Sequence, residues 1–249
     1  MNNPAADQKT LRGLFVLLLL VGILGSLMGV PWSIAVLRDP APAWLSAVVE
    51  ILFLLTPASA VGVWLGKKVG LDSRLTNLVP RLSKGRKHLH SGLLPAVPVG
   101  LALGVVGFFA QNSIPRSALM PELNNPNTLE WLLRCFSAAL TEEIFFRLGL
   151  ITFFVWIIRS IIKKAAVDIP SLWVGNLLSA LLFAGGHLPQ LIAFDWGLLI
   201  PFAVFSTSTG LIMGWLYLRY GLISAIVAHF VVDLMVYVMP RLIVAIAFA

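Results

Sequence analysis

Two adjacent carboxylates and an arginine lie within a stretch that otherwise has the composition of a membrane span. Glu142, Glu143 and Arg147 are flanked on both sides by runs rich in Leu, Phe, Ile and Trp. A charge at the centre of a bilayer costs about 3 kcal/mol on insertion scales, so three such charges need partners and a function. Glu143 and Arg147 are four residues apart, so they share one helix face and can pair. Glu142 is rotated about 100° from them and has no expected partner in its own helix, which makes it a functional candidate.

Two later apolar stretches each carry a histidine with a second notable side chain four residues away. Phe183 precedes His187, with two glycines between them, and His229 precedes Asp233. Residues four apart lie on the same face of a helix. Burying each ionisable group alone would cost free energy, so we expect three helices to bring them together in one hydrated pocket.

A glutamate beside imidazole groups is suited to activating water. A desolvated carboxylate can take a proton from water, and a neighbouring imidazole can hold the water or pass the proton on. A second imidazole can donate a hydrogen bond to the oxyanion of a tetrahedral intermediate. Alternatively, Glu142, His187 and His229 match the ligand count of a Zn²⁺ ion that would acidify the water. The spacing leaves both kinds of hydrolysis open.

The elements that must position these residues are membrane helices. Of the 249 residues, 59% are hydrophobic and only 12% are charged, whereas about a quarter are charged in soluble domains. The apolar runs are long and continuous, which favours helices over a β-barrel. We therefore predict an all-α fold, a polytopic transmembrane helical bundle of seven to eight spans with a buried polar cavity.

Apolar stretches place the spans along the chain. They are predicted at 11–36, 43–66, 93–111, 129–162, 172–191, 198–220 and 222–238, with 240–249 either an eighth short piece or the tail of the seventh. Glycines four residues apart recur in these stretches and let helices approach closely. We divide the chain into 1–128, with the N-terminal spans and a basic loop, and 129–249, a catalytic core.

Lysine and arginine are unevenly distributed between the ends of the predicted spans. One side holds Lys9, Arg12, Lys67, Lys68, Arg74, Arg81, Lys84, Arg86, Lys87, Arg159, Lys163, Lys164 and Arg219, and the other holds Arg38, Arg116, Arg134 and Arg241. The positive-inside rule places the first side, with the N-terminus, in the cytoplasm. A basic loop beside a membrane is explained by this rule and by contact with anionic lipid headgroups, so we expect no nucleic acid partner.

The motifs resemble those of the CPBP intramembrane proteases, which include the type II CAAX prenyl endopeptidases and the bacteriocin-processing Abi proteins. Glu142-Glu143-x3-Arg147, Phe183-x3-His187 and His229-x3-Asp233 are similar to the family's three signatures, in the same order, within about 129–237. The family has been described both as a metalloprotease family and as one of metal-independent glutamate proteases.

The resemblance implies a bundle of about eight spans around a conical, water-filled cavity. In it, Glu142 and His187 would activate water, and His229 and Asp233 would stabilise the oxyanion. Glu143 and Arg147 would set the helix and the cavity charge. The prenyl-endopeptidase branch usually has Asn in place of Asp233. An ionised Asp cannot donate to an oxyanion, so here it would be protonated or would orient His229.

The expected function is hydrolysis of a peptide bond in or beside a membrane, in a CAAX-type or peptide-processing substrate that is prenylated or membrane-anchored. We expect a prokaryotic plasma membrane as the location. The alternative is a non-proteolytic scaffold, such as an immunity or regulatory protein that binds a peptide in the same cavity. A proton-coupled transporter is less favoured because the sequence shows no repeat symmetry. The motifs His-Glu-x-x-His, Gly-x-Gly-Asp and Gly-x-Ser-x-Gly of other intramembrane protease classes are absent from the sequence.

Overall fold

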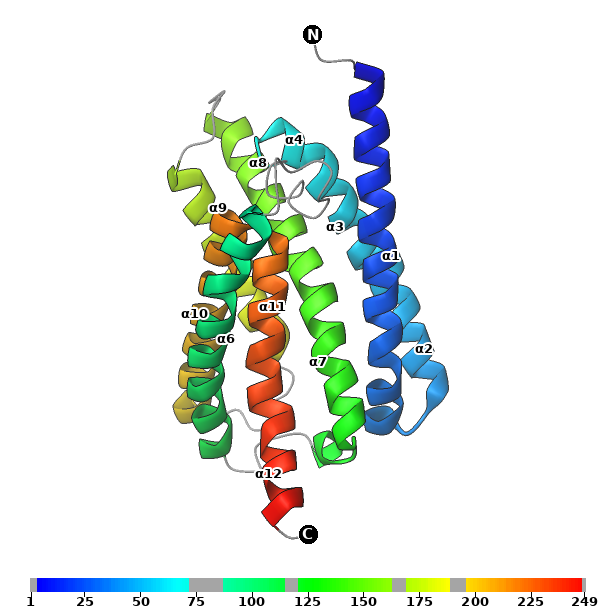
Figure 1. The fold of residues 1–249 in the computed structure, drawn as a ribbon, viewed down its shortest axis with the longest axis vertical. Coiled ribbons are helices and arrows are strands. Elements are labelled where there is room, and N and C mark those ends of the chain that lie inside the picture. Colours follow the sequence, from blue (N-terminus) through cyan, green and yellow to red (C-terminus); the bar gives the residue numbers. More distant parts are fainter. Residues whose placement is uncertain (1–3, 72–86, 115–120, 163–168, 189–195, 248–249) are drawn as a thin grey trace.

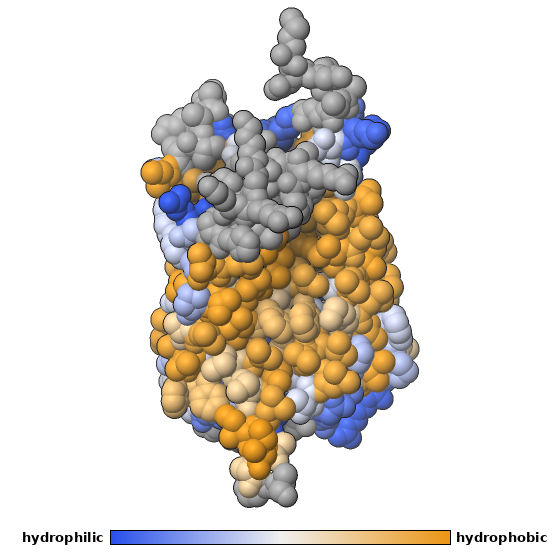
Figure 2. Space-filling model, viewed as in Figure 1, coloured by the Kyte–Doolittle hydropathy of each residue, from blue (hydrophilic) through white to orange (hydrophobic). Residues whose placement is uncertain are grey.

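The computed structural model describes residues 4–71, 87–114, 121–162, 169–188 and 196–247. These residues are almost entirely helical and include no strand. Seven of their helices are long and apolar enough to cross a membrane, and they form one bundle (Figure 1). On the face that Figure 2 shows, apolar side chains cover the middle of the bundle between more hydrophilic ends. The predicted all-α transmembrane bundle is confirmed, with seven spans.

Several spans consist of helical segments that follow one another directly. The first is α1 (Pro4–Leu37), and the second joins α2 (Pro40–Val49), η1 (Glu50–Leu55), α3 (Thr56–Ala60), η2 (Val61–Leu65) and α4 (Gly66–Lys68). The third is α6 (Lys87–Ser113), followed by the short η4 (Pro121–Asn124). The fourth joins α7 (Thr128–Glu142), η5 (Glu143–Ile151) and α8 (Thr152–Ile162). The remaining spans are α9 (Ile169–His187), α10 (Trp196–Tyr220), and α11 (Leu222–Asp233) continued by η7 (Leu234–Val238) and α12 (Met239–Ala247).

Two predicted boundaries need comment. Residues 240–247 continue the seventh span, so they are its tail and not an eighth span. In the fifth span, α9 ends at His187, and Pro189 disfavours the helical conformation of the residue before it. The predicted end of this span at 191 lies outside the described residues. Most of the predicted basic loop, residues 72–86, lies outside the described residues.

The start of α7 is fixed by a capping box. The Asn127 side chain accepts from the backbone N–H of Glu130 at 3.0 Å, and the Glu130 side chain accepts from that of Asn127 at 2.7 Å. These two bonds satisfy N–H groups that a helix otherwise leaves without partners. They set the register of the helix that carries Glu142, and η5, a π-helical segment, begins at the next residue.

The glycine pairs bring helices into close contact, as predicted. A Cβ atom at Gly100 of α6 would lie 2.8 Å from the carbonyl oxygen of Ala228 in α11, and one at Gly214 of α10 would collide with Asn176 of α9. Gly25 of α1 packs in the same way on Thr141 of α7. The division of the chain at 128/129 stays a prediction, since α6 lies before it and packs along α11 of the second part.

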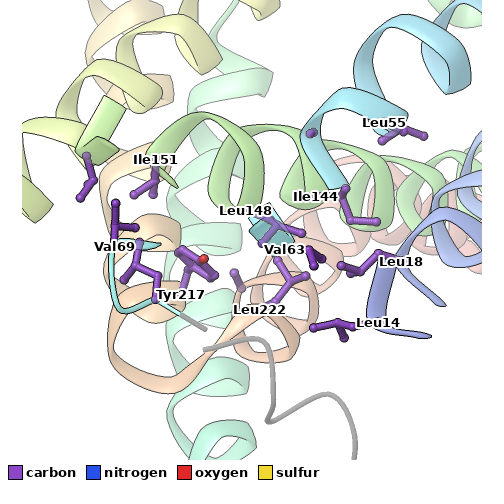
Figure 3. Close-up of a cluster of buried hydrophobic side chains, with 14 residues drawn as sticks. Leu14, Leu18, Leu55, Val63, Val69, Ile144, Leu148, Ile151, Tyr217 and Leu222 are labelled. Carbon is purple, nitrogen blue, oxygen red and sulfur yellow. The ribbon is translucent and has the colours of Figure 1, made fainter. Parts of the chain in front are cut away.

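A buried hydrophobic cluster fills one half of the bundle. Its members come from the start of α1, the second span, the fourth span and the α10–α11 turn, and include Leu14, Leu18, Leu55, Val63, Val69, Ile144, Leu148, Ile151, Tyr217 and Leu222 (Figure 3). The turn is tight because Gly221 adopts φ 99°, which other residues rarely adopt. The cavities described below lie in the other half.

Candidate active site

Glu142, the last residue of α7, presents its two carboxylate oxygens to different groups. Oε1 accepts a hydrogen bond from Arg134 at 3.0 Å. Oε2 lies 3.8 Å from Nε2 of His187 and 3.9 Å from Nε2 of His229. The prediction that Glu142 has no partner in its own helix is therefore wrong. The long Arg134 side chain reaches it from eight positions earlier, beyond the spacing of three or four that defines neighbours on a helix.

His187 is held by the last turn of α9. Its Nδ1 lies 2.8 Å from the carbonyl oxygen of Phe183, and the two rings are 4.4 Å apart. A carbonyl oxygen only accepts, so Nδ1 carries the proton and donates it. The neutral ring then presents Nε2 as an acceptor on the side of Glu142. The two residues share a face, as the spacing predicts.

His229 of α11 is oriented by Glu143. Its Nδ1 donates to Oε1 of Glu143 at 2.7 Å, while its Nε2 lies 3.6 Å from Oδ2 of Asp233. The second distance is too long for a hydrogen bond. The carboxylate that fixes the ring is therefore Glu143, whereas the sequence suggested Asp233 for that task. The two bonded residues are 86 positions apart, so no local spacing predicts their contact.

Glu143 and Arg147 form the ion pair expected from their spacing. Both side chains are fully buried, and Nε of Arg147 lies 3.1 Å from Oε2 of Glu143. The guanidinium also lies over the Phe183 ring, with 4.8 Å to its centroid. Glu143 thus uses one oxygen for Arg147 and the other for His229, which links the fourth and seventh spans beneath the site.

Two cavities meet at the histidines. The larger, of about 320 Å³, lies between α6, α10 and α11 and is lined mainly by apolar side chains, among them Gly107, Ile114, Leu198, Phe202 and Phe205. The smaller, of about 60 Å³, lies between α1 and α7 and includes Trp32, Trp131, Arg134 and Glu142. His187, His229, Asp233 and Tyr237 line both. The predicted polar site therefore adjoins an apolar chamber.

The placement of Glu142, His187 and His229 can be compared with that of the ligands in a zinc site. In the described part of the chain, no group of three or more His, Cys, Asp and Glu side chains is placed to hold a metal ion. The distances of 3.8 and 3.9 Å from Oε2 of Glu142 to the two imidazole Nε2 atoms exceed the separation of about 3.3 Å between tetrahedral zinc ligands. They suit a bridging water, which bonds each partner at about 2.7–3.2 Å. The placement does not fit zinc.

Sequence comparison identifies the family. Residues 122–235 match the family described as type II CAAX prenyl endopeptidase Rce1-like. This segment, a little under half of the chain, contains Arg134, Glu142, Glu143, Arg147, His187, His229 and Asp233. No curated protein and no solved structure matches the chain. The family is one of proteases, and the seven apolar spans make the chain an integral membrane protein. Through residues 122–235, the chain is similar to the Rce1-like family of type II CAAX prenyl endopeptidases.

Proposed function

We propose that this protein is an intramembrane endopeptidase in which Glu142 activates a water molecule for attack on a peptide bond. The observation that carries the proposal is the position of Oε2 of Glu142. It is buried, it makes no hydrogen bond to another described protein atom, and it faces Nε2 of both His187 and His229. These atoms are acceptors when the rings are neutral, so a water between them would donate to two of them.

The mechanism follows from these positions. A water held by Glu142 and His187 attacks the carbonyl carbon as Glu142 takes one of its protons. The carbonyl oxygen becomes an oxyanion, which a hydrogen-bond donor stabilises. Glu142 then gives the proton to the amide nitrogen, the C–N bond breaks, and an amine and a carboxylic acid leave. This exchange needs no group beyond the side chains and water.

His229 can act as the donor to the oxyanion in its doubly protonated form. Its Nδ1–H is already committed to Glu143, so only that form has an Nε2–H to donate. Glu143, Asp233 and Glu142 all lie within 4 Å of its ring nitrogens and balance its charge. An ionised Asp233 would then assist through His229, without donating a hydrogen bond itself.

Arg134 acts as a positioning residue for Glu142. Its bond to Oε1 fixes the carboxylate and turns Oε2 to the histidines. The guanidinium lies 5.4 Å from the centroid of the Trp32 ring, which holds the arginine between α1 and α7. An error of about 1 Å in the position of a catalytic group can cost about a hundredfold in rate, so this support matters for the reaction.

The apolar cavity indicates the kind of substrate. Its volume of about 320 Å³ and its apolar walls suit an apolar side chain or lipid-like group next to the scissile bond. We propose as substrate a membrane-anchored peptide or protein, of the CAAX type or another processed peptide, with its apolar flank in this cavity. A prenyl group is one such flank.

Replacing the base tests the proposal. We expect Glu142→Gln to abolish cleavage while the protein still inserts and folds, because an amide cannot take a proton from water. The measurement is a proteomic comparison of C-terminal and juxtamembrane fragments in cells with the native or the variant protein. Glu50→Gln is the matched control, since Glu50 is also within a span but is bonded to the Ser26 hydroxyl at 2.6 Å.

The fragment comparison distinguishes proteolysis from peptide binding without cleavage. Fragments that disappear with Glu142→Gln and persist with Glu50→Gln support proteolysis. Fragments that persist unchanged with Glu142→Gln would refute the role of this residue. If native cells contain no fragment that depends on the protein, the non-proteolytic peptide-binding scaffold is the better description.

A further inference from the structure

Both cavities lie toward the same end of the bundle. The larger is lined by the last turns of α6, from Gly107 to Ile114, and by the first half of α10, from Gly197 to Thr209. The smaller is lined by the first half of α7 and by Trp32 near the end of α1. Successive spans run in opposite directions (Figure 1), so these segments share one end, which we call the cavity end.

A contact between two connections marks the cavity end. Arg38, directly after α1, donates a hydrogen bond to the side chain of Asn125, directly before α7, at 3.2 Å. His187 also closes the last turn of its helix on this side. Glu142 and the two histidines therefore line cavities that lie toward this end of the bundle.

The opposite half is closed by packing. The hydrophobic cluster of Figure 3 joins the start of α1, the end of the second span, the fourth span and the α10–α11 turn. Val63, Ile151 and Tyr217 in this cluster have no exposed surface. A close-packed interior of this kind leaves no path for a peptide. We call this the packed end.

The packed end is also the basic end. The second span finishes there with Lys67 and Lys68, and Arg159 of α8 donates to the carbonyl oxygen of Lys68 at 3.4 Å. Arg219, in the last turn of α10, lies beside the cluster residue Tyr217 in the chain. The sequence adds Arg74, Arg81, Lys84, Arg86 and Lys87 between α4 and the start of the third span, and Lys163 and Lys164 after α8.

The cavity end has no such excess of positive charge. The described residues there include Arg38, Arg134 and Arg241, together with Asp39, Glu122 and Glu130, and the sequence adds Arg116 after α6. Short loops rich in Lys and Arg stay in the cytoplasm, and acidic residues contribute little to this preference. The charge distribution thus assigns the packed end to the cytoplasm and the cavity end to the opposite side of the membrane.

From the position of the cavities, the closed packing and the charge distribution, we infer that the catalytic centre opens to the non-cytoplasmic side of the membrane. This inference rests on the proposed function. It defines the substrates as peptides and membrane proteins whose scissile bond lies at the outer surface of the membrane and whose apolar flank enters the cavity. This narrows the substrates proposed above, because a protein confined to the cytoplasm, a prenylated CAAX protein included, cannot reach Glu142 by this route.

Cysteine labelling in intact cells tests the inference without any substrate. The background is Cys135→Ala, which removes the one native cysteine, a buried one. Single cysteines are then placed by Glu122→Cys at the cavity end, Gln111→Cys in the lining of the larger cavity, and Lys68→Cys at the packed end. Glu122 and Lys68 are both exposed, so they form a matched pair. The probe is a membrane-impermeant maleimide.

We expect Glu122→Cys and Gln111→Cys to label in intact cells, and Lys68→Cys to label only after permeabilisation. The reverse pattern, equal labelling of the two ends in intact cells, or failure of Gln111→Cys where Glu122→Cys reacts would each overturn the inference. A permeant maleimide in denaturant gives the total cysteine for every variant. Because labelling requires no catalysis, it can fail while the fragment test of Glu142→Gln succeeds, and the reverse also holds.

Discussion

At the scale of single residues, Glu143 is a buried carboxylate that serves two partners at once. It is fully buried and divides its two oxygens between Arg147 at 3.1 Å and His229 at 2.7 Å. A buried charge without a partner is strongly destabilising, so each of the three groups depends on the others. The side chain next to the base thus supports both the fold and the orientation of the imidazole.

Glu143→Gln is expected to lower the thermal stability of the protein in detergent, because it leaves Arg147 buried without a counter-charge. Removing one partner of a buried pair typically costs about 3–5 kcal/mol. The double variant Glu143→Gln/Arg147→Met removes the remaining charge and should recover much of this stability. It should not recover cleavage, since His229 still lacks its carboxylate. Thermal unfolding followed by tryptophan fluorescence, together with an assay of cleavage, checks both statements.

A double variant less stable than Glu143→Gln alone would contradict the ion-pair explanation. Native-level cleavage by the double variant would instead show that the bond from His229 to Glu143 is dispensable for the reaction.

Sequence spacing predicted the contacts made within about one helical turn and missed the others. The pairs of Glu143 with Arg147 and of Phe183 with His187 are four residues apart, and both form. The bond of Arg134 to Glu142 spans eight positions, and that of His229 to Glu143 joins two spans. The first of these contacts depends on the reach of a long side chain over two turns of α7, and the second depends on how two spans pack, and a spacing of four residues encodes neither.

At the scale of helices, the wall of the apolar cavity depends on the close approach of α6 and α11. Gly100 allows this approach, because its missing Cβ would lie 2.8 Å from a backbone oxygen of α11. Backbone atoms within a helix cannot shift easily to make room. The distance between these two helices in turn sets the width of the cavity beside His229.

Gly100→Ala is expected to push α6 away from α11, which lowers thermal stability and reduces cleavage. Gly13→Ala in α1 is the matched control, because a Cβ there meets no atom within 4 Å. The control should be neutral or slightly stabilising, since Ala is favoured over Gly in a helix by about 1 kcal/mol. Thermal unfolding of the two variants gives the comparison. Equal effects of the two changes would show that the contact at Gly100 is not important.

Apolar continuity predicted the spans well, because a stretch that must cross a membrane has few polar residues. It placed the fourth span at 129–162, and the structure has it at Thr128–Ile162. It did not predict the π-helical segment η5 that begins at Glu143, since hydropathy carries no information on the hydrogen-bond pattern within a helix.

At the scale of the whole molecule, the packed end of the bundle holds the buried hydrophobic cluster, and the cavity end holds the two cavities. The distribution of Lys and Arg along the sequence leads to the prediction that the packed end lies in the cytoplasm. It could not predict which end holds the cavities, because that depends on how Glu142, His187 and His229 are aligned in depth across three helices. In the proposed mechanism, this alignment lets groups from separate spans bind one water molecule.

The most direct test of this shared water is the rate at which the purified protein cleaves a substrate found by the fragment comparison, measured in the presence of EDTA. The rates to compare are those of the native protein, Glu142→Gln, His187→Ala and the double variant. Since residues that act as a unit have non-additive effects, the shared-water mechanism predicts an active native protein, two severely impaired single variants, and a double variant no slower than the slower single one. A double variant whose loss equals the product of the two single losses, or a native protein inactive in EDTA and restored by zinc, would contradict it.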